Sequence, residues 1–506
     1  MIAKSTQRPR ERLTTGVPGL DAVLDGGFLR FGVYIVQGKP GAGKTILANQ
    51  FCFHHAANGG RVLYVTLLAE THERMLFNLE QLAFFDSSLV ADQVSYLSAF
   101  SNLEEEGLKG LIELLRREAR SRKITLLVID GIIAVEETAQ TKSDFKKFIH
   151  ELQIHATLVG CTILLLTTAS TDSVGPEHTM VDGVVEVVDR RIARFSEREL
   201  EVTKFRGSAY LRGGHAFRIT REGIDVYPRI ESLLQDPSPE DPCQAARVST
   251  GMPSLDAALH GGLPCGTGTV MFGPTGSGKT TVGLHFLNDS RPSGPGLHFG
   301  FYETPARIVR KAKALGFDFE AKQKERALEL LWHPPTERML DALGHRLLSA
   351  VRERGVKRVL LDGIDGLLKA AVYPDRLTHF LTAVTNELRL QGATTMYSVE
   401  LPDLFSTQVA LPMQGISSLL ENVFLFRFVE QNSELRRLFT IVKLRDSNYD
   451  GTLRELRITS HGAELAEPLG SETSGTTGKS ARSLGKVGAT KAASRKRRLK
   501  LRARKA

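Results

Sequence analysis

Two short segments of the sequence carry the residues of a phosphate-binding loop. The pattern GxxxxGK[ST] occurs as GKPGAGKT over residues 38–45 and as GPTGSGKT over residues 273–280. Glycines let backbone N–H groups turn toward phosphate oxygens at a helix N-terminus, the lysine reaches the β- and γ-phosphates, and the last hydroxyl holds Mg²⁺. A glycine turn without a ligand is the alternative, which we disfavour because each loop follows an apolar run. We therefore predict two sites for ATP with Mg²⁺, formed by Gly38, Gly41, Gly43, Lys44 and Thr45 and by Gly273, Gly276, Gly278, Lys279 and Thr280.

One aspartate ends a later apolar run in each half of the chain. Asp130 follows LLVI, and Asp362 follows RVLL. An aspartate at this place in a P-loop protein organises Mg²⁺ through water. We expect Asp130 to act with Thr45 and Asp362 to act with Thr280. Each aspartate is followed by glycine rather than by a second acid, so the carboxylate that activates water must come from elsewhere.

These motifs belong to an internal duplication. TTGVPGLDAVLDGG (14–27) recurs as STGMPSLDAALHGG (249–262), and the two loops repeat at the same offset of 235 residues. The two aspartates lie 232 residues apart, and VTKFRGS (202–208) recurs as IVKLRDS (441–447) after 239 residues. Four matches in one order, with a nearly constant offset, indicate that a whole domain has been duplicated.

The elements between the motifs are typical of an α/β fold. Apolar runs such as VYIVQ, TVMFG, LLVID and TILLLTT alternate with helical stretches, which predicts in each domain a mostly parallel sheet flanked by helices. A proline-rich, acidic segment separates the repeats and reads as an extended linker. We expect a leader over 1–11, a first domain over 12–234, a linker over 235–246, a second domain over 247–469 and a tail over 470–506.

Composition indicates a soluble protein with an unusual tail. The chain has 506 residues, of which 42% are hydrophobic and 24% charged, and its longest apolar stretch is too short to cross a bilayer. No apolar segment follows the basic N-terminus, so we expect a cytoplasmic protein without a membrane partner. The four cysteines form no metal-binding pattern, and we expect them to be reduced.

The net charge of +9 comes from the C-terminus. Residues 473–506 hold 12 lysines or arginines and no acid, which leaves the rest of the chain slightly acidic. Such a segment is expected to be disordered in isolation. It suits contact with nucleic acid or with an acidic protein, and a merely solvating extension is the alternative.

Together these motifs resemble the KaiC family. The resemblance rests on the [ST]TGxPxLD opening, the P-loop, a Glu-Thr pair after the second strand and the K-[FL]-R segment, and it covers roughly residues 12–465. It implies two tandem RecA-like P-loop NTPase domains per chain. It also implies a homo-oligomer, in that family a hexameric double ring with nucleotide between subunits, and regulatory protein partners.

The resemblance also implies catalytic residues. The Glu-Thr pair places Glu70 and Glu303 where RecA-like enzymes hold the water-activating carboxylate, with a solvated helix start as the alternative. The K-[FL]-R segment of one subunit reaches the γ-phosphate bound by its neighbour in that family, in the manner of an arginine finger. This implies roles for Lys204, Arg206, Lys443 and Arg445, with a basic edge strand as the alternative.

The sequence departs from the family pattern at the acids. KaiC proteins have two adjacent glutamates before the threonine, and the first of them is Ala69 in one repeat and Tyr302 in the other. We therefore expect slow hydrolysis, with a nucleotide-gated binder that has little turnover as the alternative. GISSLLENVFLFRFVE (415–430) is similar to the segment that carries the family's phosphorylated Ser/Thr pair, which it aligns with Ser417 and Ser418; a structural role for these serines is the alternative.

Three functions are consistent with these features. The first is a KaiC-like ATPase that uses ATP binding and slow hydrolysis to switch conformation and partners. The second is an autophosphorylating serine/threonine kinase on the same fold. The third is a RecA-like DNA-binding ATPase, for which the basic tail is the only positive sign.

Overall fold

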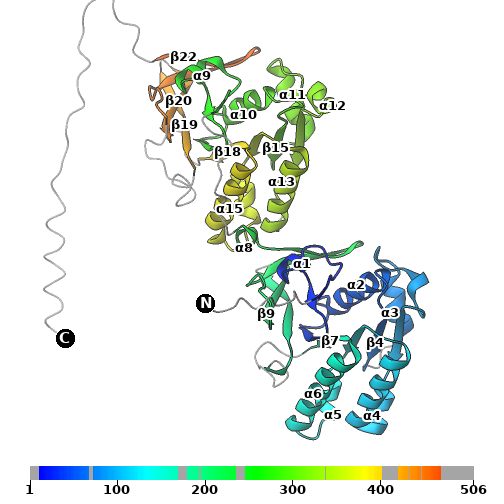
Figure 1. The fold of residues 1–506 in the computed structure, drawn as a ribbon. Helices are drawn as coiled ribbons and strands as arrows, with labels where there is room; N and C mark the ends of the chain where they lie inside the picture. The colour runs from blue at the N-terminus through cyan, green and yellow to red at the C-terminus, as the bar shows by residue number, and fades with distance from the viewer. Residues whose placement is uncertain are drawn as a thin grey trace, which may run out of the picture.

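The computed structural model describes residues 11–67, 72–168, 179–192, 195–234, 246–336, 338–401, 420–431, 433–445 and 447–468. Within these ranges the chain forms two similar α/β units, one for each sequence repeat (Figure 1). In the same ranges, no helix combines the length and the apolar character that a membrane crossing requires.

A nine-stranded sheet lies at the centre of the first unit. Its strands are β3 (Val33–Gln37), β4 (Val62–Thr66), β5 (Val94–Ser98), β6 (Leu126–Asp130), β7 (Thr162–Thr167), β8 (Gly183–Ile192), β9 (Phe195–Phe205), β10 (His215–Thr220) and β11 (Gly223–Tyr227). They lie in the order β11-β10-β9-β8-β3-β7-β6-β4-β5. The pairs from β8 to β5 are parallel, and those among β8, β9, β10 and β11 are antiparallel.

The second unit repeats this arrangement. Its strands are β14 (Gly268–Gly273), β15 (Gly296–Gly300), β16 (Leu328–Trp332), β17 (Arg358–Asp362), β18 (Thr394–Glu400), β19 (Asn422–Gln431), β20 (Glu434–Leu444), β21 (Arg454–Thr459) and β22 (Gly462–Pro468). They lie in the order β16-β15-β17-β18-β14-β19-β20-β21-β22, again parallel as far as β19 and antiparallel beyond it. The prediction of two mostly parallel sheets flanked by helices is confirmed.

Helices cover both faces of each sheet (Figure 1). Those of the first unit are α1 (Leu20–Val23), α2 (Lys44–Ala57), α3 (His72–Leu79), the 3₁₀ turn η1 (Ser87–Leu89), α4 (Phe100–Ser121), α5 (Ile133–Thr138), α6 (Lys142–Val159) and α8 (Ile230–Leu233). Those of the second are α9 (Pro253–Ala258), α10 (Lys279–Asn288), α11 (Pro305–Ala314), α12 (Phe319–Lys324), α13 (Leu340–Arg354), α14 (Ile364–Ala370) and α15 (Arg376–Leu390). Two-stranded ladders, β1 (Arg12–Leu13) with β2 (Phe28–Leu29) and β12 (Arg247–Val248) with β13 (Leu263–Pro264), lie beside the sheets.

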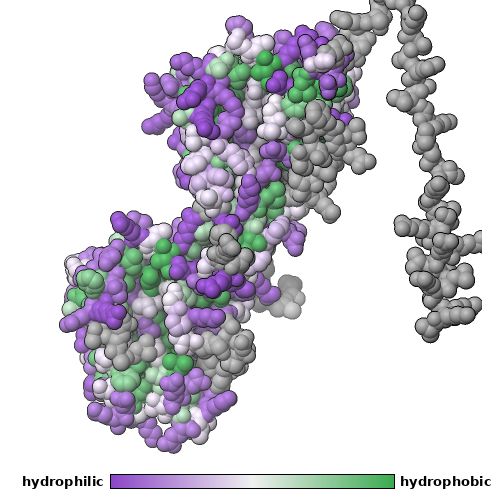
Figure 2. All heavy atoms as spheres, turned by 180° about the vertical axis from the view of Figure 1, so that it is seen from behind, coloured by the Kyte–Doolittle hydropathy of each residue, from purple (hydrophilic) through white to green (hydrophobic). Residues whose placement is uncertain are grey.

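The strands that precede the P-loops are apolar throughout because both of their faces are buried. Val33 and Ile35 of β3 belong to the core on one side of the sheet, and Tyr34 and Val36 belong to the core on the other side. A central parallel strand with helices on both faces needs such a continuous apolar run. Seen from behind relative to Figure 1, much of the surface of both units is hydrophilic, and apolar side chains are scattered over it (Figure 2).

One cysteine departs from the expectation. Cys52 and Cys161 are free and buried, as expected of reduced cysteines, and burial raises the pKa of Cys161 to about 12. Cys265, however, is disulfide-bonded, and the remaining cysteine, Cys243, lies outside the described residues. The sequence analysis did not predict a disulfide at Cys265, because the cysteines match no spacing pattern.

The end of the first unit inserts into the second. Ile230, the first residue of α8, is buried in the core formed by α13, α15 and the second sheet. Its backbone N–H donates to Asp341 Oδ1 at 3.2 Å, and His345 Nε2 lies 2.8 Å from the carbonyl oxygen of Pro228. The two units are therefore joined by packing and hydrogen bonds as well as by the chain.

A cluster of charged residues surrounds this junction. Arg376 of α15 donates to Glu231 at 2.8 Å and to Asp341 at 3.0 Å, and Tyr373 donates to Glu199 of β9 at 3.3 Å. Hydrogen bonds to charged groups contribute more than neutral ones, and they leave a large penalty when one partner is lost. Arg376 thus links α15 to α8 and α13, and Tyr373 links the second unit to β9 of the first.

Glu197 of β9 should make the stability of this junction depend on pH. Burial, then the charges of Glu199 and Asp341, raise the pKa of Glu197 to about 7, against the opposing effect of Arg376. The folded state therefore favours the protonated form, and this contribution to stability is lost as the pH rises through about 7. Glu197→Gln should match the parent at pH 5 and exceed its stability at pH 8 by roughly 1–2 kcal/mol, because the side chain is only half-buried.

The measurement is denaturant unfolding of both proteins at the two pH values. Glu222→Gln, in an exposed turn, is the control for removing one carboxylate. An equal effect of the two substitutions, or a Glu197 variant no more stable than the parent at pH 8, would contradict this assignment.

Candidate functional site

The second P-loop joins β14 to α10 and has the backbone shape of a phosphate cradle. Gly276 and Gly278 have φ values of 75° and 105°, in the left-handed region that other residues rarely adopt. Gly278 caps the N-terminus of α10, whose first residue is Lys279. The Lys279 ammonium donates to the carbonyl oxygens of Gly273 at 2.6 Å and Pro274 at 2.8 Å. The loop thus brings a cation and a helix N-terminus together, which suits an anionic ligand.

The first P-loop, between β3 and α2, has the same geometry. Gly41 and Gly43 have φ values of 79° and 111°, and the Lys44 ammonium donates to the carbonyl oxygens of Gly38 at 2.7 Å and Lys39 at 3.0 Å. A Cβ atom at Gly41 would meet nothing within 4 Å. This glycine is therefore needed for the backbone turn, and open space lies above it.

Both P-loop lysines are buried cations. Burial lowers the pKa of Lys44, and Asp130 partly offsets the shift. Burial likewise lowers the pKa of Lys279, against the opposing charges of Glu400, Asp362 and Asp365. Phosphate oxygens would supply the negative charge that these buried ammonium groups favour.

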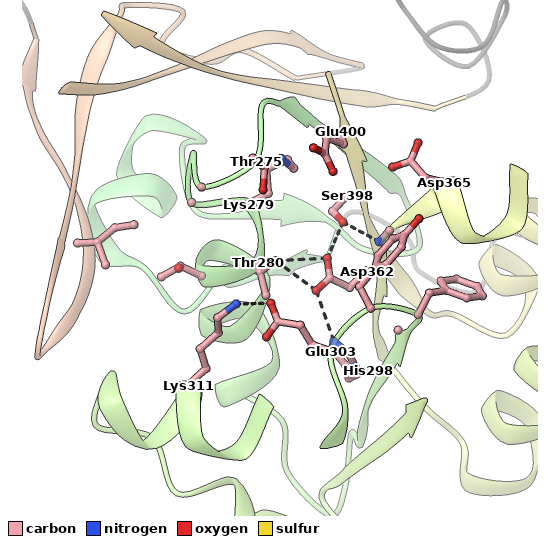
Figure 3. A pocket seen from close by; sticks show the side chains of 18 of the residues that line it. Thr275, Lys279, Thr280, His298, Glu303, Lys311, Asp362, Asp365, Ser398 and Glu400 are labelled. Atoms are coloured by element: carbon pink, nitrogen blue, oxygen red, sulfur yellow. Dashed lines mark hydrogen bonds and ion pairs between the residues drawn. The ribbon is translucent and has the colours of Figure 1, made fainter. Parts of the chain in front are cut away.

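A hydroxyl and a carboxylate lie close together next to each loop. Thr45 donates to Asp130 Oδ2 at 3.4 Å, and Thr280 donates to the two carboxylate oxygens of Asp362 at 3.2 and 3.4 Å (Figure 3). Oxygen donors of this kind suit Mg²⁺, which normally keeps waters and substrate phosphates among its ligands. Among the described residues no cluster of three or more histidine, cysteine or acidic side chains could hold a metal alone.

The two aspartates have different supports. Tyr64 of β4 donates to Asp130 at 2.7 Å, and burial together with Asp130 raises the pKa of Tyr64 far above its usual value. In the second unit the buried His298 lies 3.6 Å from Asp362, and the Ser398 hydroxyl donates to Asp362 Oδ1 at 2.5 Å. Burial favours a raised pKa for Asp362, but the contacts with His298, Ser398 and Thr280 outweigh it and hold that pKa below its usual value.

Glu303 lies in the second site, three residues after the end of β15. It lines a cavity of about 480 Å³ together with Lys279, Thr280 and Asp362, and its carboxylate forms an ion pair with Lys311 of α11 (Figure 3). The carboxylate of Glu303 therefore lies in the same cavity as the lysine of the second P-loop. Its engagement by a lysine was not expected.

Several predicted site residues lie outside the described part of the chain. These are Glu70, the serine pair Ser417 and Ser418, and the whole basic tail.

The K-[FL]-R segments lie far from the P-loops of their own domains. Lys204 pairs with Val184 of β8, close to where β8 pairs with Tyr34 near the start of β3. The P-loop begins only beyond the last residue of β3, Gln37, and at ~3.3 Å per residue this separates the two by roughly 10 Å along the sheet. Lys204 and Arg206 instead donate to the carbonyl oxygen of Thr179 at 3.1 and 2.7 Å.

The second unit repeats this placement. Lys443 pairs with Val423 of β19, near the start of β14, and donates to the carbonyl oxygen of Leu420 at 2.9 Å. Burial, then the neighbouring Arg445, lower the pKa of Lys443. Burial and Arg206 have the same effect on the pKa of Lys204. Each K-[FL]-R segment is thus a pair of close cations at the edge of the sheet away from its own loop.

A cation that the sequence reading missed does reach the second P-loop. Arg437 of β20 donates to the carbonyl oxygen of Gly276 at 3.1 Å, and its guanidinium lies 6.0 Å from the centre of the Phe428 ring. Arg198 stands in the first repeat at the same offset of 239 residues as the K-[FL]-R segments. Comparing the repeats beyond the motifs could therefore have identified this position.

The comparisons with known proteins agree with this architecture. A family model described as "ATPase: KaiC" matches residues 13–231 and again residues 248–470, which together make up most of the chain. The circadian clock oscillator protein KaiC of Acaryochloris marina is 25% identical over 468 residues, covering 90% of this chain and 88% of the relative.

Two relatives from Synechocystis are similarly distant. The circadian clock oscillator protein KaiC 1 is 26% identical over 474 residues, covering 90% of this chain and 89% of the relative. The circadian clock protein KaiC3 is 24% identical over 478 residues, covering 91% and 92%. Two family matches in tandem, on two units that each place a P-loop beside an aspartate, lead to one conclusion. The chain belongs to the KaiC family of ATPases.

Proposed function

We propose that the protein is an oligomeric switch that binds ATP at two sites per chain and hydrolyses it slowly to ADP and phosphate. The observation that carries the proposal is the presence of two complete P-loops, each with its lysine turned into the loop and its threonine next to an aspartate. The two domains, over 12–234 and 247–469, would each contribute one site.

Different residues of each site would bind the phosphates, hold Mg²⁺ and orient the attacking water. The loop backbone and Lys44 or Lys279 would bind the phosphates, and Thr45 with Asp130 or Thr280 with Asp362 would hold Mg²⁺, which lowers the charge on the phosphates when bound. Glu70 and Glu303 would orient the attacking water in their own sites. Slow turnover follows from the loss of one acid in each repeat, at Ala69 and Tyr302.

The position of the K-[FL]-R segments supports an oligomer. Lys204, Arg206, Lys443 and Arg445 lie at the end of the sheet opposite to their own P-loops, so they would have to act on nucleotide held by another chain. A cation supplied in trans stabilises charge in the transition state. We propose a homo-oligomer, a hexamer as in the family, in which bound nucleotide changes the contacts between subunits and with regulatory proteins.

Two nucleotides should bind per chain. Titration calorimetry with a non-hydrolysable ATP analogue and Mg²⁺ should give a stoichiometry of two for the parent and one for either Lys44→Ala or Lys279→Ala. Loss of a charged hydrogen-bond donor should weaken the altered site by roughly 10- to 100-fold. Lys146→Ala, an exposed lysine of α6, is the control and should retain both sites. A stoichiometry of one for the parent would contradict the proposal.

Hydrolysis should require a neighbouring chain. Lys44→Ala chains lack a working first P-loop, and Arg206→Ala chains lack the cation, so each should be nearly inactive alone when Lys279→Ala silences the second site. Random one-to-one mixing leaves roughly a quarter of the interfaces with both groups. Phosphate release should therefore recover to about that fraction of the parent rate.

The control is each variant mixed with itself under the same conditions. Mixed assemblies of confirmed composition that show no recovery would rule out action in trans.

A further inference from the structure

The second site has an unusual balance of acids. Tyr302 occupies the position of the family's first glutamate, and its hydroxyl accepts from Lys369 at 3.1 Å. The remaining acid, Glu303, is bound by Lys311. The Lys311 ammonium thus already occupies a carboxylate oxygen of Glu303. Neither residue therefore offers a free carboxylate for proton transfer.

Glu400 offers one from another strand. It is the last residue of β18, where it pairs with Gly273, the first residue of the P-loop, and the Leu401 N–H donates to the Gly273 carbonyl at 3.0 Å. The backbone thus fixes Glu400 at the edge of the loop. Its exposed side chain lines the same cavity as Lys279 and Asp362. In Figure 3 it lies toward Thr275, on the opposite side of Asp362 from Glu303.

The charge of Glu400 acts on the P-loop lysine of the second site. Among the acids that act on the Lys279 ammonium, Glu400 has the largest effect, ahead of Asp362 and Asp365. That lysine is the group expected to meet the β- and γ-phosphates. Unlike Glu303, Glu400 has no hydrogen-bond or ion-pair partner within the described ranges of the chain.

The fold does not need an acid at this position. The first repeat has Thr168 there, at the same offset of 232 residues that relates Asp130 to Asp362. Asp365, the other acid in the cavity, lies in the first turn of α14, where a negative charge is favoured by the helix N-terminus. No comparable structural reason accounts for a glutamate at the end of β18.

We propose that Glu400 is the base that activates the attacking water in the second site, in place of the acid that is missing at Tyr302. The inference rests on the proposed ATPase function. As water oxygen bonds to the γ-phosphorus and the bond from that phosphorus to the bridging oxygen breaks, Glu400 accepts the proton. The electron pair of the broken bond stays on ADP, and the proton passes to the released phosphate or to solvent. Glu303 keeps the supporting role of the family's second glutamate.

The test compares Glu400→Gln with Glu303→Gln, each with the first site silenced by Lys44→Ala. A general base contributes about 10²–10⁴-fold in rate. The Glu400 variant should therefore lose at least ~100-fold in kcat, and the Glu303 variant less than ~10-fold. Calorimetric binding of the non-hydrolysable analogue should be unchanged or tighter in Glu400→Gln, because a negative charge near the phosphates has been removed. The rate of the parent should fall at acid pH. The residual rate of Glu400→Gln should not show this fall.

A reciprocal change tests the same idea in the first site. With Lys279→Ala silencing the second site, Thr168→Glu should raise phosphate release by at least ~10-fold. Thr168→Gln, which has the same length without a titratable group, should not.

The outcomes distinguish a wrong role for Glu400 from a wrong proposal of ATP hydrolysis. Glu400→Gln with a rate within threefold of the parent, or with analogue binding lost in proportion to rate, would overturn the role of Glu400. A parent that binds the analogue at the second site but shows no turnover would overturn the proposed hydrolysis itself, and this inference with it.

Discussion

The turn from a buried strand into a helix, through glycines with left-handed backbone, is the constraint on which both sites depend. β3 and β14 are buried on both faces, so their ends are rigid, and the chain must reverse its direction within one loop to start α2 or α10. Only glycine adopts the required φ values without strain. This turn aims backbone N–H groups and a lysine at one point. The parallel strands β6 and β17, each one strand removed from β3 or β14, bring Asp130 and Asp362 to the same edge.

The sheet that brings the P-loop and the aspartate together also keeps the K-[FL]-R cations away from the P-loop of their own domain. In a parallel sheet, the carboxyl ends of strands lie at one edge, and an antiparallel strand beyond them returns its own carboxyl end to the opposite edge. Lys204 and Lys443 lie near the ends of β9 and β20, so they are carried away from the loops of their own domains. Arg437, six residues before Lys443, is still at the loop edge and reaches Gly276. One strand thus brings Arg437 to the loop of its own domain and carries Lys443 to the opposite edge of the sheet.

Motifs and hydrophobic patterns were sufficient to predict the two tandem domains and their mostly parallel sheets, because repeated segments and apolar runs can be read from the sequence itself. The contacts that distinguish the two sites were not predictable in this way. The support of Asp130 by Tyr64 and of Asp362 by His298 and Ser398 depends on which strands are neighbours. The same holds for the Glu303–Lys311 pair, for the antiparallel edges of the sheets, and for the disulfide at Cys265.

The central claim is that two nucleotide sites per chain are completed between chains. The most direct measurement is the mass of the protein in solution with and without ATP and Mg²⁺, for a chain of 55.7 kDa. Because the K-[FL]-R cations lie away from their own loops, nucleotide should favour a closed ring, and the mass should rise to a small whole multiple of the chain mass, six in a hexamer. A protein that stays monomeric with both P-loops saturated would contradict the account.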